Sequence, residues 1–291
     1  MKALLCKALS LIISFVSVVA WHTGQATFPD PKKRIDLSDF TLTFEDEFDG
    51  ELDRNIWSGH YTYGDISSVR KGTYWNNNMP YTQNGSLVIP LRYLPDGMGG
   101  TGAGWYTAGL DTSGRNGGEG FSQKYGYFEC RCILPKGCAD AWGAFWLFNE
   151  QVCDVNGDGR DGTEVDVFES FYYNDSKISA LNNKITSNIH FDGYGEAHQS
   201  QNVAKVYIKG NPYEEYNTYG VEWNENEYIF YLNGMEYARS DFGGVCKNPL
   251  YMILSVELWG ENAVPERTAE PVDFMIDYVR AYQYNEIINA K

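Results

Sequence analysis

The chain is built from short segments in which polar and apolar residues alternate, and this pattern constrains its fold more than any other feature. Alternation places successive side chains on opposite faces, as in a half-buried β-strand. The segments are rich in Tyr, Val and Phe, and Gly-containing turns separate them, of which Asn233-Gly234 is a strong hairpin signal. No long stretch has helical periodicity. The sequence therefore predicts an all-β, jelly-roll-like sandwich of two antiparallel sheets in one domain, with strands over residues 86–90, 125–133, 219–223, 228–232, 250–258 and 273–282.

Three carboxylates lie within six residues of one predicted strand, Glu164-Val-Asp166-Val-Phe-Glu169. Glu164 and Asp166 share a face because side chains alternate along a strand, whereas Glu169 stands at an odd offset from Glu164. A regular strand would therefore send Glu169 to the opposite face. A β-bulge around residues 167–168 would return it to the face of the other two carboxylates, and the sequence predicts this bulge.

With the bulge, Glu164 and Glu169 are four strand steps apart, about 13 Å between their Cα atoms. Each side chain reaches about 3.5–4 Å, so two that lean together leave about 5–6 Å between the carboxyl groups. A retaining glycosidase has its two carboxyl groups about 5–5.5 Å apart, and an inverting enzyme needs more room for a water molecule. The alternative interpretation of the motif is the acidic outer face of a solvated strand.

Residues 1–20 are typical of a secretory signal, with Lys2 and Lys7 before an apolar run and small residues before a cleavage site at 20 or 26. The run is too short to favour a membrane span, so we expect a secreted protein. The formal charge of −16 should repel nucleic acid and anionic lipid. It favours a neutral or cationic partner or a bound metal ion, unless it serves solubility alone.

After residue 20 the chain has an odd number of cysteines, so at least one thiol stays unpaired even where export permits disulfides. Cys130 and Cys132 share a strand face, where we expect buried small residues rather than a strained bridge. Cys138 and Cys153 could close a loop, and the remaining cysteine is Cys246.

Several motif classes are missing from the sequence. The cysteines and the four histidines lack zinc-site spacing, and the chain has no GxSxG, HExxH or P-loop motif. Residues 154–161 match the first half of a calcium-binding loop, but Val165 stands where the terminal Glu belongs. A full EF-hand is therefore excluded, and a polar turn is favoured over a local calcium site.

Aromatic residues make up 15% of the chain, and several could line a sugar-binding cleft. Trp142 and Trp146 share a face just before the carboxylate strand, and Trp259 ends another strand; core packing is the alternative for each. Glu129 and Arg131 face away from Cys130 and Cys132, so they bind either a sugar or each other at the surface. The candidate substrate contacts are Trp142, Trp146, Glu129, Arg131, His190 and Trp259, with a structural role as the alternative for His190.

The motif and its flanks resemble glycoside hydrolase family 16, in particular its laminarinase-like branch with a bulged E-x-D-x-x-E motif. The resemblance covers about residues 40–284 and rests on the hexapeptide together with residues 44–48, 125–131, 144–147, 218–223, 231–234 and 276–282. It implies a concanavalin-like jelly roll and retaining endo-hydrolysis of a β-glycan, most readily β-1,3- or β-1,3-1,4-glucan. Glu164 would be the nucleophile, Glu169 the acid/base and Asp166 their helper.

The resemblance also implies a domain organisation and a set of partners. A linker at residues 27–39 would precede a catalytic domain at 40–285 and a tail at 286–291. We expect a monomer that needs no cofactor for catalysis and that holds a structural calcium ion near Glu47, Gly85 and Asp277. The sequence lacks the Trp that laminarinase-like members usually have shortly before the nucleophile, so red-algal galactan stays open as a substrate. A cell-wall transglycosylase and a non-catalytic lectin on the same fold are further alternatives.

Overall fold

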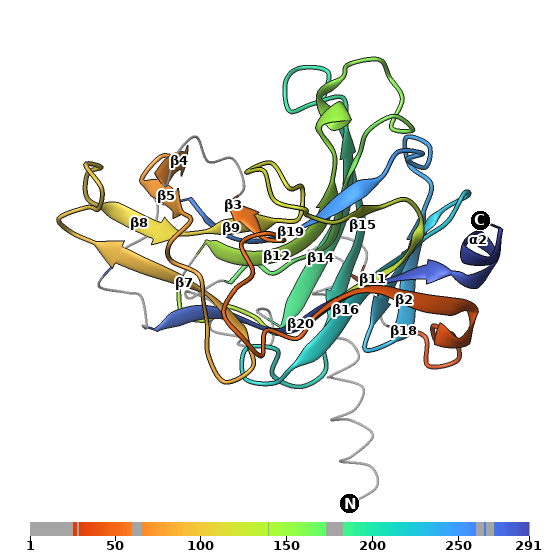
Figure 1. The fold of residues 1–291 in the computed structure, drawn as a ribbon, viewed down its shortest axis with the longest axis horizontal. Helices are drawn as coiled ribbons and strands as arrows, with labels where there is room; N and C mark the ends of the chain where they lie inside the picture. Colours follow the sequence, from red (N-terminus) through yellow and green to blue (C-terminus); the bar gives the residue numbers. More distant parts are fainter. Residues whose placement is uncertain are drawn as a thin grey trace, which may run out of the picture.

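The structure is a computed structural model that describes residues 26–27, 29–59, 66–138, 140–172, 183–259, 265 and 271–290. Two β-sheets pack against each other in a sandwich (Figure 1), which confirms the predicted all-β class. Among the described strands, all pairs are antiparallel except β1 with β15 and β5 with β8. The predicted signal segment at residues 1–20 lies outside the described residues. Among the residues described, no helix is long and apolar enough to cross a membrane.

One sheet, which we call the front sheet, contains the carboxylate strand. Its strands lie in the order β1–β15–β14–β13–β12–β19–β9–β3, and β10 pairs with β19. Their bounds are β1 Ala26–Thr27, β3 Ser58–Gly59, β9 Gly109–Asp111, β10 Ser122–Gln123, β12 Ala141–Phe148, β13 Glu164–Glu169, β14 Lys184–Phe191, β15 Gln199–Tyr207 and β19 Leu250–Leu258.

The other sheet, the back sheet, has the order β18–β17–β16–β11–β20–β7–β8–β5–β4, with β2 paired to β20 and β6 to β7. Its strands are β2 Phe40–Asp46, β4 Ile66–Arg70, β5 Thr73–Asn76, β6 Tyr81–Thr82, β7 Leu87–Leu94, β8 Gly104–Thr107, β11 Gly126–Ile133, β16 Asn217–Trp223, β17 Tyr228–Leu232, β18 Met235–Ser240 and β20 Val272–Tyr284. The described helices are short: η1 Leu37–Asp39, η2 Glu150–Cys153 and α2 Asn285–Asn289.

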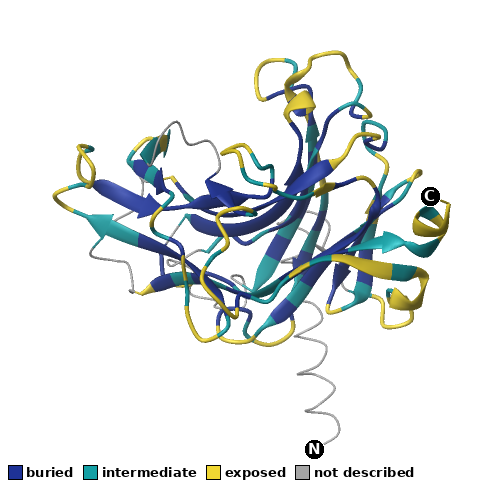
Figure 2. Ribbon diagram, in the orientation of Figure 1, coloured by how far each residue is buried: buried dark blue, intermediate teal, exposed yellow. Residues whose placement is uncertain are grey.

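The hydrophobic core lies between the sheets, and Figure 2 shows the buried positions running along the strands of both. Cys130 and Cys132 are fully buried in this core, as predicted. The described cysteines are all free, so the loop closure by Cys138 and Cys153 is wrong. The hairpin prediction is confirmed: Asn233 and Gly234 join β17 to β18 with φ values of 51° and 72°, the left-handed conformation that a tight hairpin turn requires at both positions.

The chain before β2, within the predicted linker, lies against the back sheet. Arg34 forms an isolated antiparallel bridge with Met235 on β18, and the amide of Ile35 donates to the carbonyl of Gly234. At the other end, α2 covers most of the predicted tail. Residues 154–161 form a polar turn, in which Asp158 pairs with Arg160.

Candidate active site

The predicted bulge is present in β13. Against β12, Phe145 pairs with Phe168 and Trp146 pairs with Asp166, so Val167 is the extra residue. The register of β13 against β14 shifts at the same place, between Asp166 and Glu169. Val167 and Phe168 are consecutive, yet both lie in the core at 0% exposure. The bulge therefore brings Glu169 back to the outer face that Glu164 and Asp166 share.

These three carboxylates line one cavity of about 510 Å³ on the outer face of the front sheet. The cavity is bounded by β4 and β5 at one end and by Tyr194, in the loop after β14, at the other. Its lining residues are Ser67, Ser68, Val69, Arg70, Trp75, Ala144, Trp146, Glu164, Asp166, Glu169, His190, Tyr194 and Glu257.

Each carboxylate has a different partner from the neighbouring strand or loop. The Tyr194 hydroxyl donates to Glu164 Oε2. His190 Nε2 lies 3.2 Å from Asp166 Oδ2 and 4.0 Å from Glu164 Oε1. The Asn188 amide donates to Glu169 Oε2 at 2.6 Å. His190 and Asn188 reach these groups because they stand opposite Glu164 and Asp166 in the β13–β14 ladder.

Burial and neighbouring negative charge raise the pKa values of all three carboxylates. Burial raises the pKa of Glu164, Asp166 and Glu169, and the charge of Asp166 raises the pKa of both glutamates further. His190 and the Tyr194 hydroxyl act in the opposite sense on Glu164, since they favour its charged form. A cluster of this kind retains a proton near neutral pH, which is what a general acid requires.

Arg70, which lines the cavity, packs against aromatic side chains that lie beside it. The Arg70 guanidinium pairs with Glu257 and lies over the rings of Trp259 and Trp142, 4.5 Å and 5.1 Å from their centroids. Trp142 is buried beside the cavity and does not line it, whereas Trp146 does. Trp259 is 46% exposed. The three tryptophans predicted from the sequence therefore lie along one stretch of the front sheet, with Trp259 offering an accessible ring face.

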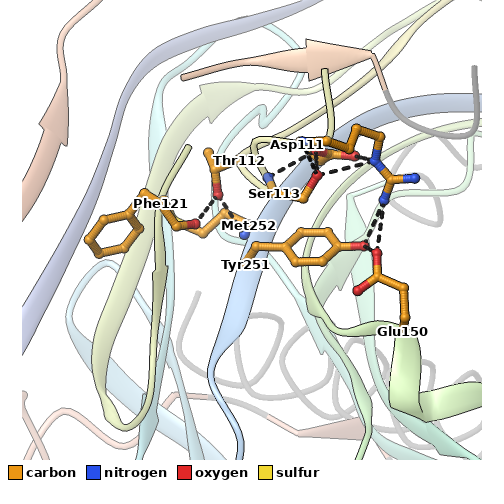
Figure 3. Close-up of polar contacts among 8 residues, drawn as sticks. Asp111, Thr112, Ser113, Phe121, Glu150, Tyr251 and Met252 are labelled. Atoms are coloured by element: carbon orange, nitrogen blue, oxygen red, sulfur yellow. Dashed lines mark hydrogen bonds and ion pairs between the residues drawn. The ribbon is translucent and has the colours of Figure 1, made fainter. Parts of the chain in front are cut away.

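Beyond Trp146, at the opposite end of β12, aromatic contacts lead to a polar network in which Asp111 and Tyr251 are buried and Arg115 and Glu150 are exposed. Phe148 packs on Trp146 and on Tyr251. The Tyr251 hydroxyl bonds to Glu150 and to Arg115, which also pairs with the buried Asp111 (Figure 3). The network joins β9, η2 and β19, so it holds the floor of the cleft in position.

Glu129 and Arg131 lie away from this cavity. Both belong to β11 in the back sheet and face outward, as their opposition to Cys130 and Cys132 predicts. Glu129 accepts from Tyr127 and Tyr282, and Arg131 pairs with Asp277. The prediction that they contact the substrate is therefore wrong for this cavity. Alternation correctly placed both side chains on the outer face of their strand, but that strand belongs to the back sheet and the cavity lies on the front sheet.

The predicted calcium ligands do not fit a calcium site as the structure arranges them. The Glu47 carboxylate pairs with Arg280 and the Asp277 carboxylate with Arg131. An arginine bound to each carboxylate disfavours a cation there. Within the described residues, the side chains close enough to share a metal ion are Glu164, Asp166 and His190, whose ligand atoms lie within 4.8 Å of one another.

The sequence did not indicate the polar lining residues Arg70, Glu257 and Tyr194, nor Asn188, which donates to Glu169. Asn188 had a usable signal, because it stands two residues before His190 and so shares its face on a strand. Arg70, Glu257 and Tyr194 lie far from the hexapeptide in sequence, and only the strand order brings them to it.

A β-sandwich with an acidic cleft and a carboxylate pair on one face of a bulged strand is the architecture of a class of glycan-cleaving hydrolases. The chain belongs to glycoside hydrolase family 16, because residues 41–284 match the family model "Beta-porphyranase A-D, GH16 domain".

Two curated relatives extend this result. The chain is 28% identical over 268 residues to Endo-1,3-1,4-beta-glycanase ExsH of Rhizobium meliloti, which covers 85% of the chain and 53% of the relative. It is 28% identical over 231 residues to Beta-porphyranase B of Zobellia galactanivorans, covering 76% and 74%. The chain thus spans about half the length of ExsH.

Solved structures share the fold. The catalytic domain of an endo-1,3-beta-glucanase (laminarinase) from Thermotoga petrophila superposes with a TM-score of 0.65 at 23% identity, covering 85% of this chain and 99% of that one. Porphyranase B from Zobellia galactanivorans gives a TM-score of 0.65 at 22% identity, covering 89% and 99%.

Proposed function

We propose that this chain is a secreted, endo-acting and retaining β-glycanase, with β-1,3- or β-1,3-1,4-glucan as its substrate. The observation that carries the proposal is the bulge at Val167, which sets Glu164 and Glu169 on the same wall of one cavity. Two carboxyl groups four strand steps apart on one face suit a covalent intermediate, because the space between them is too small for an inverting water.

The reaction has two steps. The Glu164 carboxylate attacks the anomeric carbon and forms a glycosyl ester, while Glu169 gives its proton to the departing glycosidic oxygen. Glu169 then takes a proton from water, whose oxygen attacks the same carbon and releases Glu164. Each bond that breaks is replaced by one that forms, and the proton on Glu169 is restored at the end.

The partners of the two glutamates support these roles. Tyr194 donates to Glu164, and His190 lies nearby, so the charged form that a nucleophile needs is stabilised. Glu169 is buried beside Asp166 and Glu257, and both charges raise its pKa. Burial and the charge of Asp166 raise the pKa of Glu164 as well, so the Tyr194 hydrogen bond is the contact that distinguishes Glu164 as the charged carboxylate and leaves the proton to Glu169.

The charge of the cavity favours a neutral sugar. Among its described lining residues, Arg70 is the single arginine or lysine, and its guanidinium is already paired with Glu257. The remaining charged groups are the three carboxylates of β13. A sulfated sugar would approach an acidic wall with no free cation to receive it, whereas a neutral glucan carries no charge to repel.

A second candidate is endo-hydrolysis of a red-algal galactan. It is favoured by the family model, which is that of Beta-porphyranase A-D, and by the similarity to Beta-porphyranase B. The acidic cavity favours a neutral galactan over a sulfated one within this alternative.

The experiment that tests both candidates is a product assay with the purified chain on laminarin, barley β-glucan, agarose, carrageenan and porphyran. We expect shortened oligosaccharides from one of the two glucans and none from the sulfated polymers. Glu164→Gln should abolish cleavage and leave polysaccharide binding intact. Unchanged cleavage by this variant would refute the catalytic assignment, products longer than the substrate would indicate a transglycosylase, and binding without cleavage by the unaltered chain would indicate a lectin.

The proposal that the chain is exported rests on its first 20 residues, which have the pattern of a secretory signal. Expression of the full chain in a secreting host, followed by N-terminal sequencing of the medium fraction, should give a mature chain that begins after residue 20 or 26. Retention of the uncut chain inside the cell would refute the export proposal.

A further inference from the structure

The bulge that brings Glu169 into the cavity has a polar contact on its buried side. Val167 is the extra residue, so the β13 ladder leaves it without a partner residue of its own. The Val167 carbonyl oxygen instead lies 2.8 Å from the Ser187 hydroxyl, which donates to it, and 3.3 Å from the Tyr237 hydroxyl. The two hydroxyl oxygens are themselves 2.8 Å apart.

The two hydroxyls come from opposite sheets. Ser187 belongs to β14, next to the carboxylate strand in the front sheet, and Tyr237 belongs to β18 in the back sheet. Tyr237 therefore reaches through the core to the inner side of the bulge. Ser187 is fully buried and Tyr237 nearly so, at 7% exposure. Water has little access to this carbonyl, so the side chains are its hydrogen-bond donors.

The number of hydroxyl protons decides which group donates to which. Ser187 and Tyr237 carry one hydroxyl proton each, and three close contacts join them with the Val167 carbonyl. The two shortest contacts are satisfied when Tyr237 donates to Ser187 and Ser187 donates to Val167. A chain of this kind strengthens each bond in it, and burial raises the pKa of Tyr237 so that its phenol remains a donor.

Ser187 also lies between two residues that adjoin the acid/base. Thr186 stands opposite Glu169 in the ladder, and Asn188 donates to the Glu169 carboxylate. A shift of Ser187 or of the Val167 carbonyl would therefore move Glu169 from both sides. Glu164, three residues before the bulge at Val167, is held by a separate partner, Tyr194.

We propose that Ser187 and Tyr237 are positioning residues for catalysis, which act through the Val167 carbonyl to fix the bulge and hence the distance between Glu164 and Glu169. The inference rests on the proposed function for its kinetic consequence, although its structural consequence stands without it. Rates depend steeply on such distances, since a displacement of about 1 Å can reduce turnover by about 100-fold.

The test uses substitutions that each remove one oxygen atom, Ser187→Ala and Tyr237→Phe. The matched control is Tyr219→Phe, because Tyr219 is also fully buried and packs against Phe168, at 4.4 Å between ring centroids. Its hydroxyl has no hydrogen-bond partner among the residues that the structure describes. All three variants lose the hydroxyl of a buried residue. Ser187→Ala also removes the donor to the Val167 carbonyl, and Tyr237→Phe removes the donor to Ser187.

Two substrates separate misplacement of Glu169 from simple destabilisation. The polysaccharide needs protonation of its leaving oxygen, whereas a dinitrophenyl glycoside of the same sugar has a leaving group that departs without it. We expect kcat/KM on the polysaccharide to fall about tenfold or more in Ser187→Ala and less in Tyr237→Phe. On the dinitrophenyl glycoside both variants should stay within about twofold of the unaltered chain, and Tyr219→Phe should match it on both substrates.

An equal fall on the two substrates would overturn the proposal, because loss of folded protein lowers both rates together. A polysaccharide rate as high as that of Tyr219→Phe would overturn it as well. A crystal structure of Ser187→Ala supplies a readout that needs no activity: the Glu169 carboxyl should be displaced relative to Glu164, and an unchanged separation refutes the positioning role. If the unaltered chain cleaves no glycan while the displacement is seen, the proposed function fails and the positioning role survives.

Discussion

The hydrogen bond from Tyr194 to Glu164 gives a prediction about the pH dependence of the reaction. Tyr194→Phe removes the hydroxyl and keeps the ring, which also contacts His198. The lost bond stabilised the charged form of Glu164, so the pKa of Glu164 should rise in the variant. A nucleophile attacks only when deprotonated, and the acidic limb of the kcat/KM profile should therefore move to higher pH.

The size of this shift follows from the strength of the bond. A hydrogen bond to a charged group contributes about 1.5–3 kcal/mol. Tyr194 is 52% exposed, so solvent screening brings the value to the lower limit, about 1.5 kcal/mol. One pKa unit corresponds to about 1.36 kcal/mol, which gives a shift of about one pH unit. Below the limb the variant should be slower by about tenfold, and at the optimum by less.

The assay is kcat/KM for the cleaved polysaccharide, measured across the pH range in which the chain stays folded. Tyr231→Phe is the matched control, because Tyr231 also donates its hydroxyl to a carboxylate, Glu222 Oε2 at 2.7 Å, but does so on the back sheet. Its profile should coincide with that of the unaltered chain. A Tyr194→Phe profile that stays in place, or that moves to lower pH, would refute the role of Tyr194 in keeping Glu164 charged.

Three further predictions concern substrate contact and stability. Trp259→Ala should raise KM about threefold to tenfold with little change in kcat, because stacking on an exposed ring contributes about 0.5–1.5 kcal/mol; a fall in kcat alone would contradict this. Leu254→Ala, in the core of β19, should lower the free energy of unfolding in denaturant by about 2–5 kcal/mol, whereas the exposed Val155→Ala should change it by less than about 0.5 kcal/mol. Gly234→Ala, at φ 72°, should cost about 1 kcal/mol or more by the same measurement, and equal stability of Gly234→Ala and Gly50→Ala, where the added Cβ meets open space, would disprove the strain.

The fold could be predicted because its determinants are local. Alternation fixes which face of each strand is buried, and the Asn233-Gly234 turn fixes one hairpin. The order of strands in the sheets depends on long-range pairing, which a single sequence does not specify. Glu129 and Arg131 illustrate the difference: alternation correctly turned them away from the core, but only the sheet order shows that β11 is in the back sheet.

The candidate site also contains residues that local sequence indicated and residues that only long-range pairing brings in. Glu164, Asp166, Glu169 and His190 lie on adjacent strands in a continuous part of the cavity, and their pattern could be read from spacing. Tyr194 comes from a loop, and Arg70 comes from β4 at the edge of the other sheet. A side chain supplied from such a distance leaves no periodic signal near the motif. The aromatic side chains beside the cavity were therefore only partly predictable, through the tryptophans.

The bulge itself is required by the residues that surround it. In a regular strand with Glu164 and Asp166 outward, Phe168 would point outward and Glu169 would enter the core. Burying an ionised carboxylate without a partner there is far more costly than any β-bulge, and exposing Phe168 would forfeit about 1.5–3 kcal/mol. The extra residue removes both penalties, because Val167 and Phe168 then both reach the core and Glu169 reaches the cavity. Hydrophobic burial therefore selects the bulge, while Ser187 and Tyr237 contact the carbonyl of its extra residue. The same two consecutive apolar residues that interrupt the alternation in this motif place its two glutamates on one wall.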